Sequence, residues 1–162
     1  KDRIVPDCVR SWAIGESVNL RNPNATRPWQ HVLEPLSGYL TLGAELSQRK
    51  ELHGEPFNFG PSANQNHTVL ELVQSMSRYW DKVRWTEDGK DEKQPYESKL
   101  LKLNCDKALH LLNWGTALDF QETVRMTAMW YYSYYNDPSK ILDLSLSNIR
   151  EYETILQNSD LP

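Results

Sequence analysis

The sequence predicts an α/β domain that is mainly helical and has only short strands. Apolar residues recur at helical spacing in several segments, whereas apolar and polar residues alternate only in brief runs. The seven glycines never take the Gly-x-Gly-x-x-Gly spacing of a dinucleotide-binding sheet. With 162 residues, of which 39% are apolar and 25% charged, the chain can bury one hydrophobic core. We therefore expect four or five helices and small sheets rather than one large parallel sheet.

The first part of the chain predicts two helices and two short strands. Helical spacing of apolar residues predicts a helix over residues 6–14, and Gly15 favours its end. Val18 and Leu20 alternate with polar residues and predict a strand. A brief buried strand is expected over 56–60. Between these strands, a second helix over 32–49 carries on one side Leu36, Tyr39, Leu40 and Gly43.

Two capping boxes predict helix starts in the second part of the chain. Thr68 with Glu71, and Asp119 with Glu122, each pair a short polar side chain with an acid three residues later. In such a box, both side chains satisfy backbone N–H groups that have no partner within the helix. The first helix should bury Val69, Leu72, Val73, Met76 and Trp80, and the second should bury Phe120, Val124, Ala128 and Tyr131.

The remaining segments predict short strands over 83–85 and 100–103, an exposed loop over 86–94 and a helix over 106–112. A last helix is expected after Asp137-Pro138. We divide the chain into a main domain over residues 1–136 and a helical tail over residues 137–162.

Charge and composition exclude several classes of function. The formal net charge of −4, with lysine and arginine scattered, argues against a nucleic-acid partner. Cys8 and Cys105 lie far apart and the four histidines are dispersed, so we expect two buried thiols and no metal site. No apolar run is long enough to span a membrane and the sequence does not open on a charged-then-apolar leader, which favours a soluble cytoplasmic protein. Because the chain opens on Lys1, we expect it to be part of a longer polypeptide.

The most informative segment covers residues 22–36. Asn22, Pro23 and Asn24 favour a turn, and the alternation of Trp29 and His31 suits a brief strand. Pro28 keeps Arg27 out of helical geometry, so we expect Arg27 at a rigid loop edge. A guanidinium fixed there presents a planar fork of donors to phosphate oxygens. From residue chemistry alone, a surface salt bridge for Arg27 and core packing for Trp29 explain the pattern equally well.

The sequence lacks the usual catalytic motifs. It contains no Tyr-x-x-x-Lys pair, no Gly-x-Ser-x-Gly nucleophile turn and no glycine-rich phosphate loop. We therefore expect no catalytic residue in this chain. The pattern is that of a binding surface without a catalytic centre.

The string Arg-Pro-Trp-Gln-His-Val-Leu-Glu-Pro-Leu at 27–36 resembles a segment of the CDP-glucose 4,6-dehydratases, nucleotide-sugar enzymes of the extended short-chain dehydrogenase/reductase family. Residues 2–6, 57–61 and 101–114 resemble further parts of these enzymes. The resemblance implies that the chain is the C-terminal substrate-binding portion of a Rossmann-type enzyme. Residues 1–136 would be the nucleotide-sugar-binding domain, and the N-terminal NAD-binding Rossmann core would lie outside this chain.

The resemblance also implies roles for particular residues. The nucleotide would be contacted by Arg3, Ile4 and Val5, and its base would be flanked by Asn19 and Arg21. The diphosphate would be held by Arg27, and the far wall of the pocket would be formed by Tyr96 and Glu97.

The function implied by the resemblance is that of a lyase. The parent enzyme would convert CDP-glucose to CDP-4-keto-6-deoxyglucose with NAD bound by the missing domain, and this chain alone would be inactive. The resemblance also allows a homo-oligomer formed through the parent. Two alternatives stay open: another nucleotide-sugar epimerase or dehydratase of the same family, and a non-enzymatic helical interaction module whose Tyr/Trp-rich C-terminal helix binds a partner.

Overall fold

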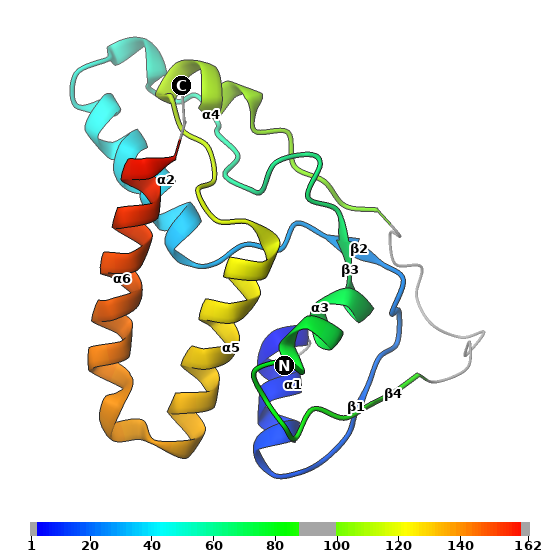
Figure 1. Ribbon diagram of the computed structural model, residues 1–162. Helices are drawn as coiled ribbons and strands as arrows, with labels where there is room; N and C mark the ends of the chain where they lie inside the picture. Colours follow the sequence, from blue (N-terminus) through cyan, green and yellow to red (C-terminus); the bar gives the residue numbers. More distant parts are fainter. Residues whose placement is uncertain (1–2, 88–99, 160–162) are drawn as a thin grey trace.

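The computed structural model describes residues 3–87 and 100–159, and this part of the chain is mostly helical (Figure 1). It contains six α-helices, one more than the four or five expected. The helices are α1 (Ile4–Ala13), α2 (Leu33–Leu46), α3 (Val69–Met76), α4 (Asp106–Leu112), α5 (Phe120–Asn136) and α6 (Ile141–Asn158).

Every strand among the described residues has two residues. Parallel pairing joins β1 (Val18–Asn19) to β4 (Trp85–Thr86), and antiparallel pairing joins β2 (Thr26–Arg27) to β3 (His67–Thr68). Two short 3-10 helices, η1 (Lys50–Leu52) and η2 (Pro138–Lys140), lie after α2 and before α6. These small pairs confirm that the strands are short.

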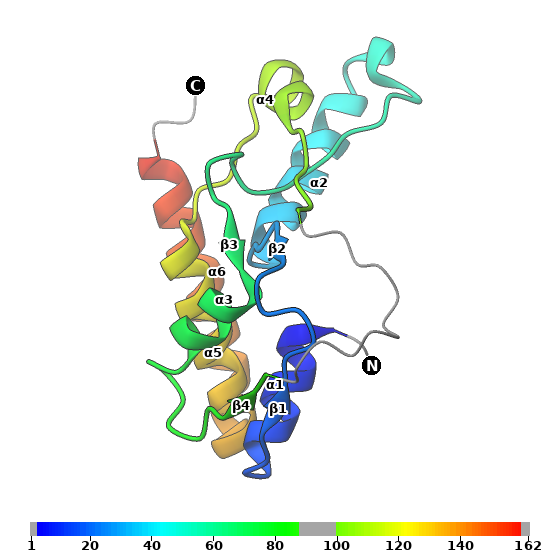
Figure 2. The same cartoon turned by 90° about the vertical axis from the view of Figure 1, so that its right-hand side faces the viewer.

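Figure 2 shows α5 and α6 along one side of the molecule, and β1, β2 and the N-terminal end of α1 away from that side. The helices α1, α3 and α5 enclose the main core together with β1. Trp12 is completely buried there, and its indole N–H donates to the carbonyl oxygen of Arg84 at 2.9 Å. The core residues include Cys8, Val9, Trp12, Leu20, Leu72, Val73, Met76, Trp80, Phe120, Val124 and Ala128.

Both predicted capping boxes are confirmed. Thr68 Oγ1 accepts from the backbone N–H of Glu71 at 3.1 Å, and Glu71 Oε2 accepts from the N–H of Thr68 at 2.6 Å. Asp119 and Glu122 make the same reciprocal pair at the start of α5. These boxes fix where α3 and α5 begin, and with them the residues that face the core.

The helix α2 does not turn its apolar side toward the rest of the molecule. Its apolar side is exposed, with Tyr39 61% and Leu40 77% accessible to solvent, whereas Glu34 and Gly38 are buried. Gly38 is needed because a Cβ atom there would lie 2.4 Å from the ring of Phe59. Close approach of this ring to the helix backbone therefore decides which side of α2 faces inward.

Three predicted strands are wrong or shortened. Residues 56–60 form no strand, because Pro56 and Pro61 offer no backbone N–H and Phe59 instead packs edge-on against Trp114. In the segment 100–103, Leu100 alone makes a bridge, with Thr26. Trp29 and His31 also lie outside any strand, since the pairing ends at Arg27.

Of the two cysteines, Cys8 is buried as expected, and burial raises the pKa of its thiol to about 12, but Cys105 is only half-buried.

The last helix packs on the rest of the described chain. Tyr152 of α6 is buried with Leu118 and Met126, and Arg125 of α5 pairs with Glu151 of α6. The helix therefore lies along α5. The division of the chain at residue 136 stays a prediction.

Candidate functional site

Arg27 lies at the end of strand β2 rather than at a loop edge. The register sets Arg27 opposite His67 on β3, and Thr26 bridges to Leu100 on its other side. Pro28 follows and has no backbone N–H to continue the pairing, so the strand ends at Arg27. The segment around Arg27 is therefore held on both sides by neighbouring backbone.

The Arg27 side chain is half-buried. Its Nη1 donates to the carbonyl oxygen of Thr26 at 2.8 Å, which folds the guanidinium back along its own strand. Arginine keeps its charge at any physiological pH. The structure thus presents a permanent cation on a fixed piece of backbone.

Side-chain bonds hold the residues that follow Arg27. The indole N–H of Trp29 donates to the carbonyl oxygen of His67 at 2.9 Å, and the amide of Gln30 donates to that of Phe59 at 3.1 Å. The ring of His67 stacks on Phe120, with centroids 3.8 Å apart and planes at 13°. These contacts fix residues 27–30 against the start of α3 and of α5.

The other predicted substrate residues lie on neighbouring elements. Arg3 is exposed just before α1, and its backbone N–H donates to Asp7. Ile4 and Val5, in the first turn, pack against the main core. Asn19 on β1 and Arg21 after it are both exposed. Tyr96 and Glu97 lie outside the described residues.

A cavity of about 550 Å³ opens beside the N-terminal end of α1. Residues of α1, α3, α5 and α6 line it together with the segment 29–33. Val5 is one of its lining residues, and Arg27 is not. The cavity thus reaches one of the residues expected to contact the nucleotide but not the one expected to hold the diphosphate. Its lining includes Val5, Trp29, His31, Val124, Thr127 and Asn148.

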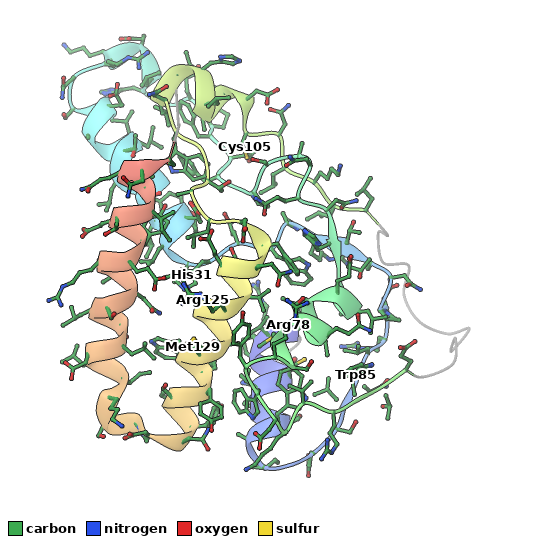
Figure 3. The ribbon with its side chains drawn as sticks, viewed as in Figure 1. His31, Arg78, Trp85, Cys105, Arg125 and Met129 are labelled. Atoms are coloured by element: carbon green, nitrogen blue, oxygen red, sulfur yellow. The ribbon has the colours of Figure 1, made fainter. Side chains whose placement is uncertain are left out.

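His31 brings a titratable group to this largely apolar cavity. It lies between α2, which it precedes, and the α5/α6 pair (Figure 3) and is 7% exposed. The N–H of Leu33 approaches its Nδ1 at 3.4 Å, a long contact. Burial lowers the pKa of His31 below its usual value, so the ring is neutral at neutral pH. His31 can therefore donate or accept a hydrogen bond there without bringing a charge.

Glu34, the most buried acid of the described residues, has no signal in the sequence. Glu34 is 1% exposed, and its Oε1 accepts from the backbone N–H groups of Ala117 at 3.0 Å and Leu118 at 2.7 Å. Its Oε2 lies 2.9 Å from the hydroxyl of Tyr152, which also lies 2.9 Å from Ser37 Oγ. Burial raises the pKa of Glu34, and these three donors oppose the rise. The carboxylate joins α2, the segment before α5, and α6.

The described residues contain no group of three or more His, Cys, Asp or Glu side chains that could hold a metal ion. No helix in this part of the chain is both long and apolar enough to cross a membrane.

Comparison with known proteins relates the chain to nucleotide-sugar enzymes. No protein-family model matches it. It is 40% identical over 132 residues to a CDP-glucose 4,6-dehydratase of Salmonella typhimurium (strain LT2). That match covers 81% of this chain but 36% of the relative, so the chain spans about a third of the relative's length.

The fold has a counterpart among solved structures. The crystal structure of UDP-N-acetylglucosamine 4-epimerase from Bacillus cereus superposes with a TM-score of 0.55 at 18% sequence identity. The superposition covers 82% of this chain and 44% of the epimerase. The resemblance read from residues 27–36 is thereby confirmed: the chain is related to CDP-glucose 4,6-dehydratase over part of that protein's length, and it folds like part of a nucleotide-sugar epimerase.

Proposed function

We propose that the chain is the C-terminal, nucleotide-sugar-binding portion of an NAD-dependent CDP-glucose 4,6-dehydratase of the extended short-chain dehydrogenase/reductase family. The observation that carries the proposal is the 40% identity over 132 residues to an enzyme of that name. The half-buried cation at the end of β2 gives it a physical basis, because a fixed guanidinium binds a diphosphate by two parallel hydrogen bonds.

In this proposal, each group of residues has a distinct task. Arg27 holds the diphosphate, Arg3, Ile4 and Val5 contact the nucleotide, and the exposed residues at β1 flank the base. Tyr96 and Glu97 form the far wall. The exposed residues at β1 are Asn19 and Arg21.

NAD does not fit the residues of this chain. The sequence has no glycine-rich turn that would let backbone N–H groups close on a pyrophosphate. We therefore assign NAD and the proton-transferring residues to another part of the parent polypeptide. The contribution of this chain is to hold the sugar nucleotide in place for the reaction.

The proposal is tested by calorimetric titration of the chain, and of two variants, with CDP-glucose. Arg27→Ala removes charge-assisted hydrogen bonds worth about 1.5–3 kcal/mol, so we expect affinity to fall by about ten- to a hundredfold. Arg78→Ala is the matched control, because Arg78 is an exposed arginine just after α3 that bonds to Gln121 (Figure 3). Equal affinity of the Arg27 variant and the control would refute the role of Arg27, and absence of CDP-glucose binding by the parent enzyme would refute the function.

A second candidate is supported by the fold match to a UDP-N-acetylglucosamine 4-epimerase. The chain would then bind a UDP sugar for another enzyme of the same family. Competition between CDP-glucose and UDP-N-acetylglucosamine for the chain decides between the two. Tighter binding of the UDP sugar would favour the epimerase.

A further inference from the structure

The cavity lined by α1, α3, α5 and α6 differs in character from the region expected to bind the sugar nucleotide. Of the predicted substrate residues that the structure describes, Val5 alone lines it. No aspartate, glutamate, lysine or arginine of the described residues lines it either. Its volume of about 550 Å³ is in the range of pockets that hold small organic molecules. The cavity can therefore enclose a molecule of that size but has no cation for a diphosphate.

Aromatic rings form part of the cavity wall. Trp29, Trp130 and Tyr131 are among its lining residues. The indole N–H groups of both tryptophans are already bonded, that of Trp29 to the carbonyl oxygen of His67 and that of Trp130 to Ser145 Oγ, at 2.9 and 2.8 Å. These two bonds hold the rings in place. Fixed aromatic rings favour a flat, apolar ligand, because such a ligand packs on them without any need for the rings to be ordered first.

Buried polar residues also gather at this cavity. Of the five polar or charged residues that are buried in the described chain, three line it: His31 at 7% exposure, Thr123 at 6% and Asn148 at 8%. Within residues 3–87 and 100–159, no hydrogen bond involves the side chain of Thr123 or Asn148, and none involves Nε2 of His31. Buried polar groups normally have a hydrogen-bond partner. These three side chains are therefore free to bond to a molecule in the cavity.

The polar groups match a hydroxyl group on the ligand. The Asn148 amide and the Thr123 hydroxyl can each donate and accept. Nδ1 of His31 faces the N–H of Leu33, which favours the tautomer with the ring proton on Nε2. Burial lowers the pKa of His31, so the ring brings no charge at neutral pH. A hydroxyl group can donate to and accept from this set, whereas a charged group would lose its solvation without gaining a counter-charge.

We propose that this cavity binds an uncharged aromatic molecule that carries a hydroxyl group, at a site separate from that of the sugar nucleotide. The ring system of the ligand packs on the aromatic and aliphatic lining. Its hydroxyl group bonds to the amide of Asn148, with Thr123 and His31 as further partners. The proposal goes beyond the proposed function and does not depend on it.

The test is equilibrium dialysis of the full chain at neutral pH against three probes that share one ring system: 2-naphthol, naphthalene and 2-naphthoate. We expect 2-naphthol to bind with a dissociation constant about tenfold lower than that of naphthalene, because it gains a hydrogen bond to a buried group. The anion 2-naphthoate should bind most weakly, since its carboxylate would be desolvated. Equal affinity for 2-naphthol and naphthalene, tighter binding of 2-naphthoate, or no saturable binding of any probe would overturn the proposal.

Two asparagines of α6 provide a matched pair of variants. Asn148→Leu removes the amide, keeps much of its volume and should bring the constants for 2-naphthol and naphthalene to within about twofold of each other. Asn158→Leu, at an exposed asparagine of the same helix, should keep the tenfold difference. If the difference survives in the Asn148 variant or is lost in the Asn158 variant, the assignment of the hydroxyl group to Asn148 is wrong.

A third variant tests whether the probes occupy this cavity. Thr127→Trp places a large ring among the lining residues and should weaken both neutral probes by about tenfold or more. Unchanged affinities would place the probes elsewhere and overturn the proposal. Circular dichroism confirms that each variant remains helical.

Competition with CDP-glucose separates this site from the proposed nucleotide site. An excess of CDP-glucose should leave the dissociation constant of 2-naphthol unchanged, because Arg27 does not line the cavity. Displacement of 2-naphthol would assign the cavity to the nucleotide site and overturn the proposal. Failure of CDP-glucose to bind at all would count against the proposed function alone, since the selectivity among the three probes is measured without it.

Discussion

The phenol oxygen of Tyr152 lies 2.9 Å from Oε2 of Glu34, so the last helix provides a hydrogen bond to a carboxylate buried on α2. The two residues are 118 positions apart in the sequence. Two backbone N–H groups, of Ala117 and Leu118, bond to the other carboxylate oxygen. A buried acid needs such donors because desolvation penalises its charged form. The attachment of α6 to the rest of the molecule is therefore coupled to the solvation of Glu34.

Removing the Tyr152 hydroxyl should destabilise the protein. Tyr152→Phe keeps the ring among Leu118 and Met126 but leaves Glu34 one donor short, which should cost about 1–3 kcal/mol of unfolding free energy. Tyr132→Phe, at a hydroxyl on a 41% exposed residue, should change it by less than about 0.5 kcal/mol. Urea denaturation measures both. Equal effects of the two substitutions would contradict the role of the buried bond.

The contribution of Glu34 to the unfolding free energy should decrease as the pH rises. Its pKa is raised in the folded protein above the ordinary value of 4.5, so the folded state binds the proton more tightly than the unfolded state. The stabilisation is complete below 4.5 and is lost as the pH rises through the folded pKa. Glu34→Gln removes this contribution. The unfolding free energy of the original chain minus that of the variant should therefore fall as the pH rises above 4.5, and a flat difference would contradict the assignment.

His31 should have the opposite pH dependence. Burial lowers its pKa below 6.5 in the folded state, so the unfolded state binds the proton more tightly. Stability from this source is complete above 6.5 and is lost as the pH falls toward the folded pKa. His31→Asn should abolish that part of the pH dependence of the denaturation midpoint. His110→Asn, at an exposed histidine on α4, should preserve it.

Two glycines of the same helix should respond oppositely to alanine. A Cβ atom at Gly38 would lie 2.4 Å from the ring of Phe59, so Gly38→Ala should cost about 1–3 kcal/mol of unfolding free energy. Gly43 has no atom within 4 Å of the corresponding position, and Gly43→Ala should stabilise the helix by about 0.5–1 kcal/mol. Thermal unfolding of both variants checks this. Similar melting temperatures would show that α2 does not pack on Phe59 as described.

The helices could be predicted because their signals are local. Residues 106–112 form a helix with the predicted bounds, and the two capping boxes locate the starts of α3 and α5. Strands depend on a neighbour that local pattern cannot reveal. Residues 56–60 alternate as a strand would, yet no other described strand lies beside them to accept the backbone bonds.

The site could be predicted only in part, for the same reason. The string around Arg27 identified the relative, but its pairing with His67 required knowledge of which distant segment lies alongside. Glu34 carried no signal, because an acid in the first turn of a helix usually faces solvent. Its burial follows from the meeting of three segments, and periodicity describes each segment separately.

The bond from Trp12 to the carbonyl oxygen of Arg84 and the one from Trp29 to that of His67 have a common consequence. Each lies beside a strand pair of two residues, so a single indole nitrogen supplies a large share of the polar contacts across that junction. Phenylalanine would fill much of the same volume but would remove this donor, and among the described residues only the backbone N–H of Val18, at 3.0 Å, would then bond to the carbonyl oxygen of Arg84. Hydrogen exchange at these two indole N–H groups should therefore report the opening of the two junctions, one by one.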